Sequence, residues 1–236
     1  MTGEGKKDTE PWIEQKHVKY AYAYDKGGKL ASKLGVSGIP HAFLINAQGK
    51  IVWDGHPGEL SDDVIKGALA GSLPSPLFDL PASANALKAA LLKRSYSVAL
   101  AEAAKVPAAD GGGELPAVVQ SIITGRVQTL SASLKEGNFL DAQELASALK
   151  KELEGLPEAA EADKALAEIK ANKEADKISA AQKKVRQILD GKLGKKAEFE
   201  KALGDLKKIS KDFPGTYAAK EADEATTQVL KKRNAK

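Results

Sequence analysis

Three histidines, His17, His41 and His56, are the residues best suited to acid–base or metal chemistry, because the sequence contains no cysteine. Without a thiol the chain has no cysteine nucleophile, no thiolate metal ligand and no disulfide of its own. The histidines are scattered and lack the paired spacing of a metal-binding motif. We therefore expect no metal site and no cofactor, and we interpret all three as packing or surface residues.

Two further groups have the composition of a catalytic motif without its spacing. The stretch TGEGKK at 2–7 resembles a phosphate-binding loop, but it lacks the GxxxxGK[ST] spacing and no apolar strand precedes it. Asp62 and Asp63 are adjacent, so their carboxylates point in different directions from the first turn of a helix. There they complement the helix dipole, and neither group predicts an active site.

The composition predicts a mostly helical protein. Hydrophobic residues make up 42% of the 236 residues, but aromatic residues make up only 5%. The apolar content is dominated by Ala and Leu, which favour helices over sheets. The charged first ten residues do not resemble a signal peptide, and no run of about 18 apolar residues is present, so we expect no membrane span in this chain.

The net charge of +4 is spread too thinly to indicate a nucleic-acid partner. Residues 1–72 carry nine Lys and nine Asp/Glu, so the excess falls on residues 73–236, with 27 basic and 23 acidic residues. There Lys alternates with Glu and Asp at helical spacing, which is typical of solvated helix faces. No aromatic residues or Gly-Arg pairs are interleaved with the Lys residues, and we expect no nucleic-acid partner.

The first part of the chain predicts short helices around a strand. TEPWIEQKH predicts a helix over 9–17 with Thr9 as its N-cap. VKYAYAYD alternates with a period of two, which predicts a strand over 18–25 that leads into a turn from Asp25 to Gly28. KLASKLGV predicts a helix from residue 29 that ends at Gly35.

A β-hairpin is the strongest local prediction. The apolar runs HAFLIN and KIVWDG are separated by Ala47-Gln48-Gly49, a connection of the length and composition of a hairpin loop. Ser61 then predicts the N-cap of a helix that ends at Gly71. We expect this helix to bury Val64, Ile65, Ala68 and Leu69.

The rest of the chain predicts helices only. SLPSPLFDLP, with three prolines, is a connector, followed by one helix from Ser83 to the residue before Val106. AADGGGELP at 108–116 predicts a hinge. We therefore divide the chain into residues 1–72, a connector over 73–115 and a helical domain over 116–236. Its expected helices are 116–136, 138–154, 157–190, 195–212 and 215–234.

An internal repeat with an offset of 60 residues supports the helical domain. Both copies predict an apolar helix, a Gly/Pro turn and an Ala-rich helix, and they resemble tetratricopeptide-type hairpins. A plain helical bundle is the alternative interpretation. The aligned pairs are Phe139 and Phe199, Ala142 and Ala202, Leu149 and Ile209, Leu153 and Phe213, Gly155 and Gly215, Ala165 and Ala225, and Ile169 and Val229.

Residues 1 to about 71 resemble the distal part of the TlpA/ResA-type thioredoxin-like (redoxin) family. TGEGKKDTEPWIEQKH, VKYAYAYD and GGKLASKLGV match a helix, a strand and a helix of that family in order. GIPHAFLIN matches the loop and strand with the family proline, and GKIVWDGHPGEL matches the closing strand and turn. The fold class implied is α/β plus all-α: an incomplete thioredoxin-like module followed by helical hairpins.

The resemblance implies a substrate-binding loop formed by Ile39, Pro40 and His41, with a cis Ile39–Pro40 bond. In the family, the backbone of the residue before this proline faces the active-site dithiol and pairs with an extended substrate. His41 stands where the family more commonly has Thr. The expected partner at this loop is a protein or peptide substrate, and the helical domain is a second candidate surface for a protein partner.

The Cys-x-x-Cys unit of the family has no counterpart in these residues. We therefore expect a thiol-disulfide oxidoreductase that is truncated before this unit and inactive as this chain. The resemblance also implies a periplasmic or membrane-anchored bacterial protein. Two alternatives stay open: a non-catalytic thioredoxin-like and helical-repeat module that binds proteins, and a structural helical protein in which residues 1–71 are a remnant.

Overall fold

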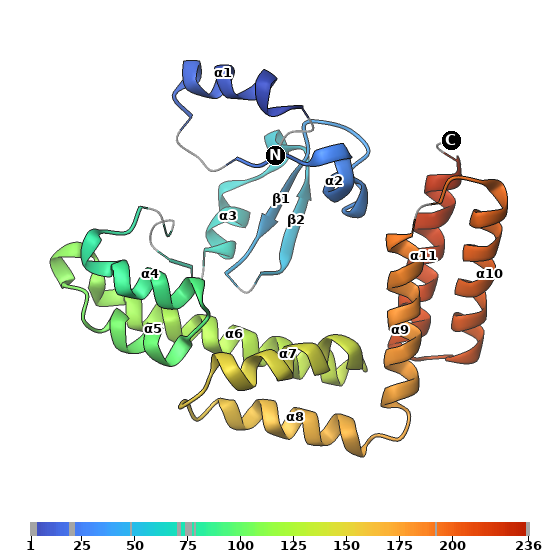
Figure 1. Cartoon of the computed structure of the whole chain (residues 1–236). Coiled ribbons are helices and arrows are strands. Elements are labelled where there is room, and N and C mark those ends of the chain that lie inside the picture. Colours follow the sequence, from blue (N-terminus) through green and yellow to red (C-terminus); the bar gives the residue numbers. More distant parts are fainter. Residues whose placement is uncertain are drawn as a thin grey trace.

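The protein, seen in a computed structural model, is mostly helical with one small sheet in the part described (Figure 1). Helices account for 70% of the residues, and the sheet has two antiparallel strands. A mostly helical fold with a small sheet is therefore confirmed. The structure describes residues 4–18, 22–47, 49–69, 72, 73, 77, 79–191 and 193–234.

The first part of the structure, here called the α/β module, comprises residues 4–69. Its helix α1 begins earlier than predicted, with Gly5 and not Thr9 as the N-cap. The Gly5 carbonyl accepts the Thr9 amide at 3.2 Å and the Thr9 hydroxyl at 2.9 Å, which places Thr9 inside the first turn. The elements are α1 (Lys6–Lys16), α2 (Lys29–Lys33), β1 (Ala42–Ile45), β2 (Ile51–Gly55) and α3 (Asp62–Ala68).

The strand predicted over 18–25 lies partly outside the described residues, because 19–21 are not described. Within 22–25 the chain makes only an isolated bridge, at Tyr24. The end predicted for the following helix is confirmed, since Gly35 adopts φ 74° just after α2. The Val36 amide there donates to the Ala31 carbonyl at 2.9 Å, as in a left-handed helix end.

The predicted β-hairpin is confirmed. Strands β1 and β2 are antiparallel, with Ala42 opposite Gly55 and Leu44 opposite Trp53. The connection is closed by Asn46, which exchanges backbone and side-chain hydrogen bonds with Lys50 at 2.9–3.0 Å.

The burial predicted for α3 is largely wrong. Only Ala68 is buried, whereas Val64 and Leu69 are 37% and 57% exposed. The apolar stripe is present in the sequence, but among the described residues little packs against it. The predicted helix end at Gly71 lies outside the described residues.

The described residues from 79 onward form eight α-helices, two more than predicted for this region. Helix α5 is separated from α4 at Arg94, a left-handed residue with φ 55°. Helix α9 is separated from α8 at Asn172, whose side-chain oxygen accepts the Glu174 amide at 3.0 Å. The helices are α4 (Asn85–Leu92), α5 (Tyr96–Ala103), α6 (Leu115–Lys135), α7 (Phe139–Glu152), α8 (Ala159–Ala171), α9 (Ala175–Asp190), α10 (Lys196–Asp212) and α11 (Tyr217–Asn234).

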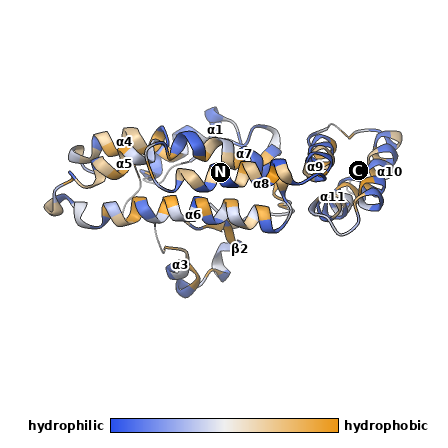
Figure 2. Ribbon diagram, turned by 90° about the horizontal axis from the view of Figure 1, so that it is seen from below, coloured by the Kyte–Doolittle hydropathy of each residue, from blue (hydrophilic) through white to orange (hydrophobic). Residues whose placement is uncertain are grey.

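One contiguous apolar core connects these eight helices, from Leu80 to Val229. Figure 2 shows apolar and polar residues alternating along the helices, as expected for helices that bury one face. Helices α9, α10 and α11 stand side by side and run across the direction of α6, α7 and α8 (Figure 1). No helix among the described residues is long and apolar enough to cross a membrane.

The two repeat copies bury equivalent positions. In hairpins α7–α8 and α10–α11, the turn glycines Gly155 and Gly215 adopt φ 83° and 72°. The aligned aromatic residues Phe139 and Phe199 are both buried. The same holds for the aligned pairs Ala142 and Ala202, Leu149 and Ile209, Ala165 and Ala225, and Ile169 and Val229. The pair Leu153 and Phe213 differs, because Leu153 is buried and Phe213 is half-buried.

The segment predicted as a hinge forms two packed 3-10 turns, Ala108–Asp110 and Gly112–Glu114. Gly112 is buried against the chain, and a Cβ atom there would lie 2.0 Å from the Val106 carbonyl oxygen. The Ser83 hydroxyl donates to the Asp110 carboxylate at 2.6 Å, which ties the first turn to the start of α4. The division into three domains stays a prediction.

Candidate functional site

The loop Ser37–His41 joins α2 to the start of β1 and is the most exposed apolar part of the module. Ile39 is 93% exposed, and Gly38 and Pro40 are also exposed. The Ile39–Pro40 peptide bond is cis, as the resemblance implies. Of the three residues predicted as a substrate-binding loop, Ile39 and Pro40 are thus exposed, and His41 is half-buried.

The backbone of Ile39 has free hydrogen-bonding groups. Among the described residues, neither its amide nor its carbonyl has a hydrogen-bond partner, and the ladder with β2 begins only at Ala42. Unpaired backbone groups next to a strand are the groups that an added extended peptide uses. This arrangement suits binding of a polypeptide backbone.

His41 packs against the sheet. Its ring centroid lies 4.8 Å from that of Phe43, and its Nε2 lies 3.8 Å from Oδ2 of Asp54. That distance is longer than a hydrogen bond. The interpretation of His41 as a packing residue agrees with this geometry.

Asp25 holds the helix that leads to the loop, although the sequence suggested only a turn residue. Its two carboxylate oxygens accept the amides of Leu30 and Ala31, each at 2.9 Å. These hydrogen bonds, with that of Ala31 the larger, lower the pKa of the Asp25 carboxyl below its usual range. The charged carboxylate therefore fixes the first turn of α2.

The other two histidines have structural roles. His17 caps the C-terminus of α1, and its amide donates to the Glu14 carbonyl at 3.2 Å. Nδ1 of His56 accepts the Gly58 amide at 3.1 Å. No group of three or more His, Asp or Glu in the described part of the chain is arranged to hold a metal ion.

A buried group of polar side chains, here called the polar joint, links α7, α9 and α11. Its centre is Gln182, which is fully buried. Nε2 of Gln182 donates to Oδ1 of Asn138 at 2.7 Å and to Oε2 of Glu221 at 3.2 Å, and its Oε1 accepts the Leu140 amide at 3.2 Å. The joint consists of Asn138, Asp141, Gln182, Arg186 and Glu221.

Arg186 supplies the charge of the polar joint. Its guanidinium donates to Asp141 and, at 2.9 Å, to Glu221, so it connects a residue of α7 to a residue of α11. Burial raises the pKa of Asp141, but the hydrogen bonds from Arg186 and Asn138 outweigh it and the pKa is lowered overall. Each of the three charged side chains of the joint, Asp141, Arg186 and Glu221, therefore has an oppositely charged partner.

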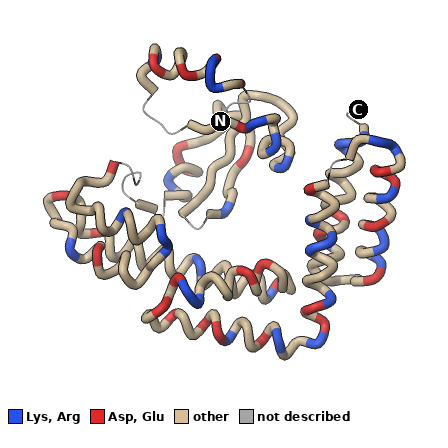
Figure 3. Tube along the Cα trace, in the orientation of Figure 1, with Lys and Arg blue, Asp and Glu red and all other residues tan. Residues whose placement is uncertain are grey.

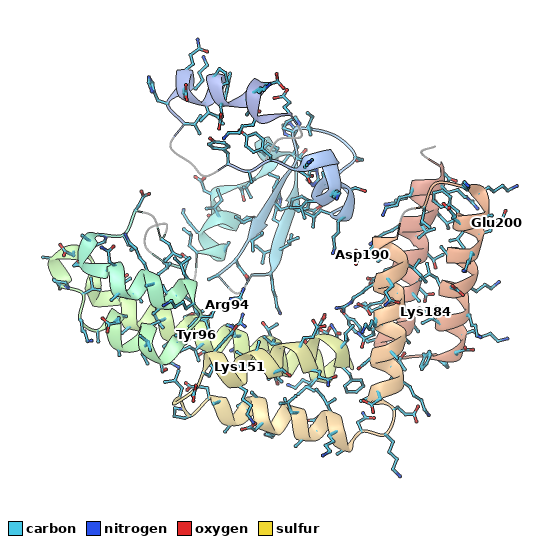
Figure 4. All side chains as sticks on the ribbon, viewed as in Figure 1. Arg94, Tyr96, Lys151, Lys184, Asp190 and Glu200 are labelled. Atoms are coloured by element: carbon cyan, nitrogen blue, oxygen red, sulfur yellow. The ribbon has the colours of Figure 1, made fainter. Side chains whose placement is uncertain are left out.

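A second network of charged and aromatic side chains joins α4 and α5 to α6 and α7. Glu152 of α7 pairs with Arg94 at 3.4 Å and with Arg126, and the guanidinium of Arg126 lies 5.9 Å from the Tyr96 ring centroid. Figure 4 labels Arg94 and Tyr96, which lie where α4 and α5 meet α6 and α7. Burial raises the pKa of Tyr96. The left-handed turn at Arg94 thus places its guanidinium beside the Glu152 carboxylate of α7.

A groove of about 510 Å³ lies beside the turn into α11. Tyr217 and Thr216 line it together with three acidic residues, Glu136, Asp223 and Glu224. Burial, then nearby carboxylates, raises the pKa of Tyr217. Elsewhere basic and acidic residues alternate along the helices (Figure 3), in agreement with solvated faces.

Comparison with known proteins adds no assignment. No protein-family profile, curated protein or solved structure matches this chain. The site therefore has to be interpreted from its own geometry.

Proposed function

We propose that residues 1–72 form the distal part of a thioredoxin-like module of the TlpA/ResA type, and that the loop of Ile39, Pro40 and His41 binds an extended polypeptide. The observation that carries this proposal is the exposure of Ile39 with unpaired backbone groups just before β1. A polypeptide that pairs with these groups extends the sheet by strand addition. The order of helix, loop and hairpin in the sequence supports the family.

Thiol chemistry requires cysteines from outside these 236 residues, because the chain has none. In this proposal the loop holds a disulfide-containing substrate, and a thiolate supplied from elsewhere attacks the disulfide. The chain alone binds polypeptide but does not reduce insulin above the buffer rate.

The test is a titration of the ¹⁵N-labelled chain with insulin B chain whose cysteines are carboxymethylated. We expect the largest amide shifts at Ile39, His41 and Ala42, because these residues flank the unpaired backbone groups. Ile39→Pro removes the amide donor and should abolish the shifts, whereas the matched control Ile39→Val keeps the amide and should preserve them. Binding that survives in Ile39→Pro would contradict the proposal.

A second candidate function is binding of a protein partner by the helical repeat. The groove beside Tyr217 favours it, because that groove is formed at the turn of the second repeat copy. In the same titration, shifts confined to 136 and 215–224 would select this function over binding at Ile39.

A further inference from the structure

The two repeat copies differ at one equivalent place, the end of the first helix of each hairpin. Glu152 and Leu153 end α7, and the aligned residues Asp212 and Phe213 end α10. The Glu152 side chain is only 11% exposed and Leu153 is fully buried. Asp212 is exposed and Phe213 is half-buried. This surface is therefore covered in the first copy and open in the second.

In the first copy the cover is the helical pair α4 and α5. Helix α5 packs on α6, and Arg94, at the turn between α4 and α5, pairs with Glu152 at 3.4 Å. The buried residues of α5 are Tyr96, Ala99 and Ala103, which share one helix face. The cover is thus a helix with one aromatic anchor, two small residues, and an arginine two positions before the aromatic residue.

In the second copy the corresponding surface is a groove between α9 and α10, here called the α9–α10 groove. Its volume is about 380 Å³, and its apolar lining consists of Ala180, Ala181, Ile209 and Phe213. The Asp212 carboxylate also lines it, and no cation in the described part of the chain pairs with that carboxylate. The aligned Glu152, in contrast, has two arginine partners, Arg94 and Arg126.

We propose that the α9–α10 groove binds a helix of a partner protein that has the contact features of α5. Repeats of this kind meet their neighbours through equivalent surfaces, so the helix that covers the first copy indicates what fits the second. Small residues at i+3 and i+7 from the aromatic anchor let the helix approach the apolar lining. An arginine before that anchor supplies the counter-charge for Asp212.

This proposal is independent of polypeptide binding at Ile39. The α9–α10 groove also shares no residue with the groove beside Tyr217. Substitutions in the α9–α10 groove therefore test it alone.

The first measurement uses a fluorescein-labelled synthetic peptide of residues 84–106, which contains α4, Arg94 and α5, and the full chain as receptor. The first copy is already covered by its own α4 and α5, so we expect saturable binding at a single site in the second copy. Ala180→Trp fills the groove and should weaken binding at least about tenfold in fluorescence anisotropy. The control Ala167→Trp, at an exposed alanine of α8 outside the groove, should bind as the unchanged chain does.

Circular dichroism checks that both tryptophan variants keep their helices. Absence of saturable binding, or equal binding by the two variants, overturns the proposal.

The second measurement tests the predicted pair between Asp212 and the peptide arginine by a double-mutant cycle. Asp212→Asn in the chain and Arg94→Gln in the peptide should each weaken binding about tenfold, and together no more than either alone, because both remove the same ion pair. Asp176→Asn, which removes an exposed carboxylate of α9 outside the groove, is the control and should change nothing. Additive losses, or a loss in Asp176→Asn equal to that in Asp212→Asn, overturn the assignment of Asp212.

Discussion

Asp25 shows how one side chain positions the loop that carries Ile39. Its carboxylate fixes the first turn of α2 through the Leu30 and Ala31 amides, and α2 ends at Lys33, shortly before the left-handed Gly35 and the loop. The end at Gly35 follows from the sequence, because a glycine after a short amphipathic run is a local signal. The cap by Asp25 could not be predicted from the sequence, because an aspartate in a turn has several possible backbone partners.

Gly112 provides a prediction about the packed turn before α6. A Cβ atom at this residue would lie 2.0 Å from the Val106 carbonyl oxygen, so Gly112→Ala forces the backbone apart. We expect a loss of stability of about 1–3 kcal/mol, the usual cost of overpacking. Denaturant unfolding measures it.

The neighbouring Gly113 is the matched control. Nothing lies within 4 Å of a Cβ atom built there, so Gly113→Ala should leave stability within about 1 kcal/mol or raise it slightly. Equal effects of the two substitutions would mean that residues 108–114 are a flexible hinge, as the glycine-rich sequence predicts.

At the scale of elements, local signals explain which predictions succeeded. The hairpin of β1 and β2 has a Gly-containing loop between two apolar runs, and it formed as expected. The helix breaks at Arg94 and Asn172 carry neither Gly nor Pro, so the sequence predicted continuous helices there. At these breaks α4 turns back to pack on its neighbour α5, and α9 leaves α8 to pack on α7 and α11, which are distant in the sequence.

The polar joint was missed for the same reason. Gln182 lies among Lys and Arg residues and suggests a solvated helix position, but its partners Asn138 and Glu221 are 44 and 39 residues away. Only the folded chain brings them together. The repeat offset indicates that the two hairpins are alike but does not say which polar residues join them.

Gln182→Leu tests the polar joint. The substitution removes the acceptor of the Leu140 amide and a donor to Asn138 at a fully buried position. We expect a loss of about 1–3 kcal/mol, because buried polar groups are left unsatisfied. Thermal or denaturant unfolding measures the change.

Gln187→Leu on the same helix is the control, because Gln187 is exposed, and its effect should stay within about 0.5 kcal/mol. If Gln182→Leu is as neutral as Gln187→Leu, the joint does not hold the two repeat copies together.

At the scale of the whole molecule, the chain combines a continuous core with a module that has almost none. The core cluster runs from Leu80 to Val229, and of the residues between the module and Leu80, Leu73 and Leu77 pack against it. Between the two parts an ion pair joins Lys33 to Asp190 at 3.9 Å, with both side chains at least 70% exposed. Exposed ion pairs contribute little stability. The sequence predicts this division by composition, but not how little of the module is buried.

Stability should therefore differ between the two parts, and native-state hydrogen exchange measures the difference. In the full chain, with its single mass checked by light scattering, we expect amides of 42–55 to exchange by local opening well before those of α6 and α9. The reason is that large side chains of the module, such as Ile39 and Leu69, stay more than half exposed in the folded chain, whereas Val119 and Val185 are almost fully buried. Equal protection of 42–55 and α6 in a verified monomer would show that the module is stable without a partner.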